Sequence, residues 1–427
     1  KKIMFKFVAA ATLFGLAAAD PEWTIAAGGK PIASMAMGVS ASSADGSEAL
    51  VAAGSSSSGG FIMSTANSGG NFTTVPDSQG MAFMSIGADT ESGNAVAGGM
   101  FATIYGNAEG FQPSQISKMT ITQSVEAVHG AKDNFVLAGT VGMKNAIAVS
   151  QDAGATWTTK TVPTQEPVRY VAAPSADVMY VTAGMWPVDD DSDQMDFSQF
   201  ISRGTDGLLR LNLANGGTDD CHNYADEDTC DADSACTWCK SAAVPSSCYT
   251  MEEISALPPS IFACDASEEE ETNSGSAGTG WSAEVWKTTN GGDDWEMVFS
   301  DYTTFYPNGI DCYDESTCAF VAEGDHTYVY MTTDGENFTK MHEDDTAGAS
   351  LMAVRMVSDS EVHAMGGLVV SPGMKATCWH STDAGNTWDD IMGIKNLFVM
   401  AADFSDAEHG FASAMTLTNM GDILRYE

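Results

Sequence analysis

A short segment that recurs along the chain limits the folds open to it. Its two most complete copies read Ser-x-Asp-x-Gly-x-Thr-Trp, and the others keep the Asp or Asn, a Gly and the final aromatic residue. The copies occupy residues 65–72, 106–111, 150–157, 288–295, 332–338 and 381–388. An Asp or Asn side chain accepts hydrogen bonds from backbone N–H groups just downstream, and Gly supplies the positive φ of a tight turn. Each copy therefore predicts a β-hairpin turn.

The aromatic residue that ends each segment is expected to begin the next strand and to pack between layers. In this interpretation the Asp, Asn and Trp side chains hold the turn in shape and do no chemistry. The residues assigned this structural role are Asn67, Asp152, Trp157, Asn290, Trp295, Asp334, Asp383 and Trp388.

A second pattern recurs seven times and sets the size of the repeating unit. It is a polar turn followed by an apolar strand ending near Ala-x-Gly, and its copies end at residues 54, 98, 139, 184, 324, 366 and 414. Successive ends lie 41 to 48 residues apart, except for a step of 140 residues between 184 and 324. A period in the forties with several short strands is typical of β-propeller blades. The sequence therefore predicts an all-β, seven-bladed propeller over residues 20–427, with an insertion at residues 185–280 in blade four.

The two ends of this ring are expected to meet. Residues 422–426 have the composition of a strand, and so do residues 23–25 near the other end. Pairing them would close the ring and remove the open sheet edges that promote aggregation.

The insertion is predicted to be a small disulfide-bonded module. It carries six of the nine cysteines, namely Cys221, Cys230, Cys236, Cys239, Cys248 and Cys264. Six cysteines in a short segment with little apolar core favour three disulfides, whose pairing the sequence leaves open. The Cys236-x-x-Cys239 spacing also suits zinc or redox chemistry, but in a segment so rich in cysteine a structural role is favoured.

The three remaining cysteines and the acidic run that begins the insertion are interpreted separately. Cys312 and Cys318 flank a predicted hairpin turn, so they are expected to form a disulfide. Cys378 has no predicted partner, and its state is left open. The acidic start of the insertion includes Asp189, Asp191 and Asp193, whose oxygen atoms are of the kind that bind Ca²⁺. A solvated loop is favoured there, because the run lacks EF-hand spacing, and no other cofactor is expected.

The first 19 residues have the pattern of a secretory signal peptide. Three lysines come first, residues 7–16 are apolar, and residues 17–19 are an Ala-Ala-Ala cleavage site. The apolar run is too short to cross a bilayer and no later run is longer, so no membrane insertion is expected. Secretion agrees with the cysteine content. Asn71 and Asn337 begin glycosylation sequons, which predicts a secreted glycoprotein.

The net charge limits which classes of binding partner are expected. The chain holds 58 Asp and Glu against 18 Lys and Arg, for a formal net charge of −40. Such a charge argues against binding nucleic acid or an anionic membrane surface, and it is compatible with cations or basic partners. The expected partner is a protein or a glycan.

Catalytic motifs are missing from the sequence. It contains none of the short patterns of zinc proteases, P-loop proteins or serine hydrolases, and its histidines are scattered. A glycoside hydrolase needs only two carboxylates at a set separation, so hydrolysis is kept as an alternative. The favoured interpretation is a protein that is not an enzyme.

The recurring turn resembles the Asp-box, or BNR repeat, of sialidase-like and Ycf48/Hcf136-like β-propellers. The chain is more similar to the Ycf48/Hcf136-like group, because the early arginine motif of sialidases is absent. The resemblance implies that the Asp-box turns are structural and lie away from the ligand face. Members of that group are non-catalytic assembly factors for photosystem II in the thylakoid lumen, so the resemblance also implies that role and a plastid location.

Three functions therefore follow from the sequence. The favoured one is a secreted, non-catalytic Asp-box β-propeller that serves as a protein- or glycan-binding or structural module. The alternatives are a Ycf48/Hcf136-like photosystem II assembly factor in a plastid lumen and a glycoside hydrolase of sialidase-like fold.

Overall fold

The structure is a computed structural model, and every structural statement below concerns the residues it describes. These are residues 21–55, 59–79, 83–99, 103–106, 112–113, 127–131, 134–138, 146–187, 230, 236–241, 247–250, 262–264, 280–370, 373–416 and 421–427. The predicted signal peptide at 1–19, the three candidate Ca²⁺ ligands Asp189, Asp191 and Asp193, and Cys221 lie outside them.

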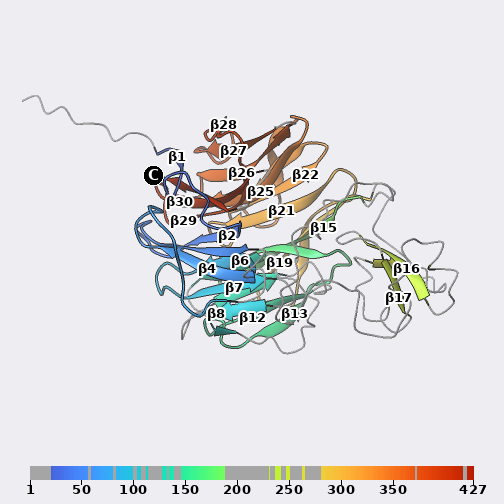
Figure 1. Ribbon diagram of the computed structural model, residues 1–427. Helices are drawn as coiled ribbons and strands as arrows, with labels where there is room; N and C mark the ends of the chain where they lie inside the picture. Colours follow the sequence, from blue (N-terminus) through green and yellow to red (C-terminus); the bar gives the residue numbers. More distant parts are fainter. Residues whose placement is uncertain are drawn as a thin grey trace, which may run out of the picture.

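Seven four-stranded antiparallel sheets form the ring, as predicted for an all-β, seven-bladed propeller (Figure 1). We number the blades one to seven in chain order. Blade one is β2 (Met35–Ala41), β3 (Ala49–Ser55), β4 (Gly59–Thr65) and β5 (Thr73–Thr74). Blade two is β6 (Phe83–Ala88), β7 (Ala95–Gly99), β8 (Thr103–Gly106) and β9 (Gln112–Pro113). Blade three is β10 (Ala127–Ala131), β11 (Asn134–Ala138), β12 (Ala146–Ser150) and β13 (Thr158–Thr161).

The remaining four blades complete the ring. Blade four is β14 (Val168–Ala172), β15 (Met179–Met185), β19 (Ser282–Thr288) and β20 (Glu296–Asp301). Blade five is β21 (Phe305–Cys312), β22 (Cys318–Gly324), β23 (Thr327–Thr332) and β24 (Thr339–Asp344). Blade six is β25 (Ala349–Met356), β26 (Val362–Val370), β27 (Gly373–Ser381) and β28 (Asp389–Asp390). Blade seven is β29 (Phe398–Phe404), β30 (Gly410–Met415), β31 (Asp422–Tyr426) and, from the other end of the chain, β1 (Trp23–Ile25).

The closing strand is the one predicted. β1 pairs with β31 in antiparallel register, with Trp23 opposite Tyr426 and Ile25 opposite Leu424. The Trp23 ring packs against Phe404 and Tyr426, with ring centroids 5.7 Å and 5.2 Å away. Blade seven is thus built from both ends of the described chain, which ties blade one to blade seven.

The seven recurring apolar segments are the second strands of the seven blades: β3, β7, β11, β15, β22, β26 and β30. A second strand is hydrogen-bonded on both edges and covered by other blades on both faces, so an apolar run suits it. All five residues of β7 and the first six of β15 are buried. The core lies between blades, as where Tyr180 of blade four packs with Phe305 and Phe320 of blade five.

Antiparallel strands place the hairpins of each blade on two opposite faces of the ring. Turns between first and second strands, and between third and fourth strands, share one face, which we call the turn face. Connections between second and third strands, and between successive blades, share the other face, which we call the loop face. The chain between β15 and β19 joins a second strand to a third strand, so it leaves the ring on the loop face.

All five described copies of the recurring turn are third-to-fourth-strand hairpins on the turn face. In the first full copy, Ser150 Oγ and the Thr156 N–H donate to Asp152 Oδ1, at 2.9 Å and 2.8 Å. Trp157 Nε1 donates to the Gly154 carbonyl at 3.0 Å. Equivalent oxygen contacts are made by Asn67, Asn290, Asp334 and Asp383. One glycine in each of the five turns (Gly69, Gly154, Gly292, Gly335 and Gly385) has φ between 72° and 87°, as predicted.

These turn residues therefore hold the backbone, and the structure does not gather them into one pocket. Trp295 and Trp388 repeat the indole contact of Trp157, donating to the carbonyls of Gly292 and Gly385. Residues 107–111 of the sixth copy lie outside the described residues.

The disulfide predicted between Cys312 and Cys318 is present. Cys312 and Cys318 are bonded across the β21–β22 hairpin, with Cα atoms 4.0 Å apart. Between β15 and β19, a three-stranded sheet of β16 (Cys236–Ser241), β17 (Ser247–Thr250) and β18 (Phe262–Cys264) holds the Cys230–Cys248 disulfide. Cys236 and Cys239 are disulfide-bonded too, which supports the structural role predicted for them. Cys378 is a buried free thiol.

Among the residues that the structure describes, none belongs to a helix with the length and apolarity needed to span a bilayer.

The hydrogen bonds in the recurring turns predict how the stability of the fold depends on pH. Hydrogen bonds from the Thr387 backbone and hydroxyl lower the pKa of Asp383 below its ordinary 3.8. A lowered folded-state pKa stabilises the fold above the ordinary value and loses that effect as pH falls through the folded value. We expect Asp383→Ala to lower the melting temperature near pH 7, and Asp383→Asn to lower it less, because Asn67 makes the same Oδ1 contacts.

Differential scanning calorimetry between about pH 7 and about pH 2 checks this expectation. The difference between wild type and Asp383→Ala should narrow at the acid end. A difference that is constant with pH, or an equal loss for Ala and Asn, would contradict it.

Candidate functional site

The candidate site lies on the loop face, where the chain leaves blade four and returns to it. Trp186 directly follows β15, and Trp281 directly precedes β19. The two stems touch: a Cβ atom added to Gly280 would lie 3.0 Å from the Cα of Pro187. Gly280 has φ of 78°, so this close approach and this backbone both require glycine.

Three partly exposed aromatic rings form the centre of the site. Tyr306, near the start of β21 in blade five, stacks on Trp281 with ring centroids 6.0 Å apart and an interplanar angle of 5°. It meets Trp186 edge-on at 5.3 Å. We call Trp186, Trp281 and Tyr306 the aromatic platform, which joins both stems of blade four to blade five.

A buried cation lies beside the platform. The Arg169 guanidinium carbon is 5.1 Å from the ring centroid of Tyr306 and 5.4 Å from that of Trp186, within the range of a cation–π contact. Arg169 is 7% exposed, so its guanidinium group interacts with protein atoms and hardly with solvent. Its Nε donates to the Pro307 carbonyl at 3.0 Å, and its Nη2 donates to Asn308 Oδ1 at 3.1 Å.

Carboxylates lie beside residues of the platform or next to them in the chain. Glu323 of β22 accepts hydrogen bonds from the Ser350 hydroxyl and, at 3.4 Å, from Asn308 Nδ2. Burial raises the pKa of Glu323. Burial, followed by the charge on Glu323, also raises the pKa of Tyr306, so this phenol stays protonated at neutral pH.

A second acidic pair lies in the connection to blade four and in β19. Glu166 accepts a hydrogen bond from the Ser282 hydroxyl at 2.7 Å, and burial, followed in the same direction by the Glu284 charge, raises the pKa of Glu166. Glu284 accepts from the hydroxyls of Thr164 and Tyr302, at 2.5 Å and 2.6 Å. Trp286 Nε1 donates to it at 2.6 Å. Glu284 is therefore engaged by three donors of its own chain.

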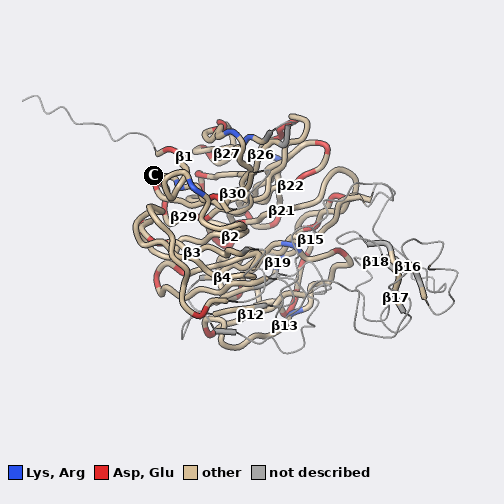
Figure 2. The backbone as a smooth tube through the Cα atoms, viewed as in Figure 1, with Lys and Arg blue, Asp and Glu red and all other residues tan. Residues whose placement is uncertain are grey.

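This arrangement suits noncovalent binding. Aromatic rings beside carboxylates in a protein of net charge −40 favour a ligand with cationic side chains. Figure 2 shows Asp and Glu along the turns of the ring with few Lys or Arg among them. Aromatic and Arg side chains that pack together are also the residues that dominate binding energy at protein interfaces.

A polar cavity of about 180 Å³ opens near the axis at the turn-face ends of the first strands. Arg355 Nε lies 3.2 Å from Asp403 Oδ1, and Asp311 Oδ2 accepts the Met356 N–H at 2.8 Å. Burial, aided by the Arg355 charge, lowers the pKa of His129 to about 4, so it is neutral. Arg355 with Asp403, and Asp311 with Met356, are bonded between neighbouring blades, so these groups of the cavity wall have a structural role.

The aromatic platform was not predicted from the sequence. One signal was present, because Trp186 and Trp281 lie at the two ends of the predicted insertion. Tyr306, Arg169 and Glu323 join them only through the contacts between neighbouring blades.

The sequons lie in turns on the opposite face. Asn67 Nδ2 donates to Asn71 Oδ1 at 2.6 Å, and Asn337 Nδ2 donates to Asp334 Oδ2 at 2.8 Å. Asn71 and Asn337 are both exposed, and their glycosylation stays a prediction.

Comparison with known proteins finds similar folds among solved structures. No protein-family model and no curated protein sequence matches this chain. Among solved structures, Ycf48 bound to D1 peptide matches with a TM-score of 0.52 and 10% identity, over 96% of this chain and 98% of that one. Ycf48 from Cyanidioschyzon merolae gives 0.53 and 11%, over 95% and 99%. The WD40 β-propeller domain of Doa1 gives 0.51 and 6%, over 93% and 94%.

At these identities the likeness shows the fold alone. The chain is a seven-bladed β-propeller, a fold that serves as a binding module in many proteins. Ycf48 is among its structural neighbours.

The raised pKa of a buried acid in the site leads to a second prediction about stability. An acid whose folded-state pKa is raised destabilises the fold above its ordinary pKa, and this effect disappears as pH falls to that value. We therefore expect Glu166→Gln to raise the melting temperature by roughly 2 °C near pH 7, because it removes repulsion from Glu284 and can still accept from Ser282.

The gain should vanish near pH 4, which thermal unfolding by circular dichroism can measure. Glu408→Gln, at an exposed acid on the turn face, is the matched control and should leave the melting temperature unchanged. A Glu166→Gln variant that is less stable at both pH values would show that the carboxylate is a net stabilising group.

Proposed function

We propose that this protein is a secreted, non-catalytic β-propeller that binds a protein partner through its loop face. The observation that carries the proposal is the aromatic platform of Trp186, Trp281 and Tyr306, partly exposed at the root of the insertion, with Glu323 and Arg169 beside it. The structural neighbour Ycf48 bound to D1 peptide supports a peptide or protein as the ligand class.

The five turns support placing this propeller with the Asp-box proteins of the sialidase-like superfamily. Each one uses the Asp or Asn oxygen and the Ser or Thr hydroxyl in the same way, and each lies on the turn face. Secretion is supported by the signal-like start of the sequence and by the Cys312–Cys318 and Cys230–Cys248 disulfides.

The ligand we propose is a basic segment of a protein. Lys and Arg side chains gain from both the rings and the acidic surface, and their attraction to a chain of charge −40 speeds association. The carboxylates Glu166, Glu284 and Glu323 are engaged by hydroxyl, amide or indole donors of this chain, which favours binding over glycoside hydrolysis. A glycan ligand is an outcome that the experiment below distinguishes.

The binding face can be tested with a random Lys- and Arg-rich peptide library displayed on phage. Peptides selected on the wild-type protein are expected to bind Trp281→Ala about 10- to 30-fold more weakly, because an aromatic anchor at an interface contributes about 2 kcal/mol. Fluorescence anisotropy with labelled peptides measures the dissociation constants.

Tyr313→Ala is the matched control, since Tyr313 is 51% exposed on the turn face in the β21–β22 hairpin. Its affinity should equal that of the wild type. Unchanged binding by Trp281→Ala, or a loss with Tyr313→Ala instead, would overturn the loop-face assignment. Binding of a neutral glycan array in place of the peptides would change the ligand class to carbohydrate.

A photosystem II assembly factor in a plastid lumen is the second candidate, favoured by the two Ycf48 structures that match over 95% or more of this chain. Expression of the tagged protein in its native cell separates the candidates. Under our proposal we expect the tag in the secretory pathway or the medium, detected by fractionation. Import into plastids would favour the assembly factor.

A further inference from the structure

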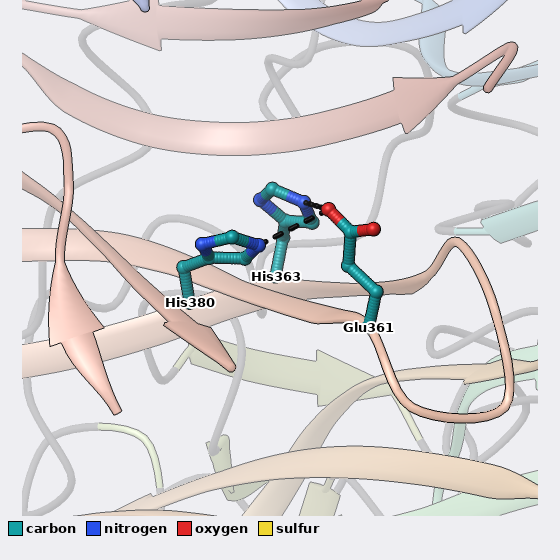
Figure 3. Close-up of side chains that lie close together, drawn as sticks. All are labelled: Glu361, His363 and His380. Atoms are coloured by element: carbon teal, nitrogen blue, oxygen red, sulfur yellow. Dashed lines mark hydrogen bonds and ion pairs between the residues drawn. The ribbon is translucent and has the colours of Figure 1, made fainter. Parts of the chain in front are cut away.

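A second cluster of polar side chains lies in blade six, away from the loop face. Glu361 directly precedes β26, His363 is the second residue of β26, and His380 lies near the end of β27. His363 and His380 are register partners in the antiparallel pair. Glu361 and His363 are two residues apart, so their side chains leave the extended chain on the same side. Figure 3 shows the three side chains converging.

The distances within this cluster match those between metal ligands. Glu361 Oε1 lies 3.1 Å from His380 Nε2 and 3.3 Å from His363 Nε2, and the three candidate ligand atoms all lie within 4.8 Å of one another. Ligand atoms at zinc–ligand distances near 2.0 Å in a tetrahedron are about 3.3 Å apart. The Glu361 carboxylate oxygen therefore already lies from both imidazole nitrogens at the ligand–ligand spacing of a zinc coordination sphere.

The surroundings hold one ligand firmly and leave the others accessible. The His363 side chain is fully buried, with its ring centroid 4.4 Å from that of Phe404 in blade seven. His380 and Glu361 keep 17% and 19% of their side-chain surface exposed, so an ion could reach them from solvent.

A further contact would hold one of the histidine rings in the orientation that a metal ligand needs. Histidine ligands in metalloproteins commonly use their other ring nitrogen to bond a neighbouring group. His363 Nδ1 lies 3.7 Å from Sγ of the buried free thiol Cys378. With Nε2 directed to the ion, Nδ1–H can donate to this sulfur, which fixes the orientation of the ring.

We infer that Glu361, His363 and His380 form a binding site for a divalent transition-metal ion such as Zn²⁺. Two imidazoles and one carboxylate suit a borderline ion of this kind, whereas Ca²⁺ and Mg²⁺ prefer oxygen ligands alone. Three protein ligands leave a fourth position for water. The ion would join β26 to β27 at the side of blade six that packs on blade seven, and this site is independent of the loop-face function.

The test uses the whole protein and Zn²⁺ alone as the probe. Isothermal titration is run with excess Ca²⁺ present, which occupies weak acidic sites on the surface. We expect one Zn²⁺ per chain in the wild type and affinity lowered more than about 100-fold in His380→Ala, because removing a ligand should weaken binding more than removing a group that only orients a ligand. His326→Ala is the matched control, at a partly exposed histidine whose Nδ1 lies 2.6 Å from Glu343, and should bind as the wild type does.

Two readouts guard against a folding artefact. Circular dichroism checks that His380→Ala is folded; if it is not, Glu361→Gln, at a partly exposed turn position, decides instead and should also lose the tight site. Co²⁺ in place of Zn²⁺ should give the visible absorption of a four-coordinate ion in the wild type and in His326→Ala only. Equal Zn²⁺ affinity in folded His380→Ala and wild type, or binding abolished by Ca²⁺, would overturn the assignment.

Discussion

Directional hydrogen bonds between the first strands of neighbouring blades fix the register of blades five, six, seven and one. Apolar packing between blades is strong but has no preferred direction. Near the turn face, Asp403 of blade seven pairs with Arg355 of blade six and accepts from the Ser40 hydroxyl and Ala41 N–H of blade one, at 2.7 Å and 3.0 Å. Asp311 of blade five accepts from Met356 of blade six. Because these groups are largely removed from water, a shift of one blade would leave them unpaired at high cost.

The same kind of bond builds the loop-face site. Arg169 crosses from blade four to the Pro307 carbonyl of blade five, and Asn308 Nδ2 continues to the Leu351 carbonyl of blade six at 2.9 Å. The residues that position Tyr306 are therefore the residues that fix three blades relative to one another. A rigid ring thus presents its aromatic platform already ordered, which lowers the entropy that a ligand must overcome on binding.

The features that could be read from the sequence are local or periodic. The turn chemistry lies within eight residues, the seven second strands recur at blade spacing, and Cys312 and Cys318 sit on one hairpin. The sites depend on register and could not be read in this way. In six blades the pairing of first and second strands shifts register, for example between Ala36 and Gly38. No sequence period shows such a bulge, or that His380 lies opposite His363.

The two faces differ in how their polar groups are used, and this difference supports binding at the loop face. On the turn face, each described Asp or Asn of the recurring turns directs its oxygen to donors within its own hairpin. Such turns have little capacity left for a partner. On the loop face, polar groups such as Arg169 are bonded within the protein, while Trp186, Trp281 and Tyr306 are only partly buried. Covering exposed aromatic area gains free energy without breaking the bonds that hold the ring, so a ligand can bind there while the propeller stays unchanged.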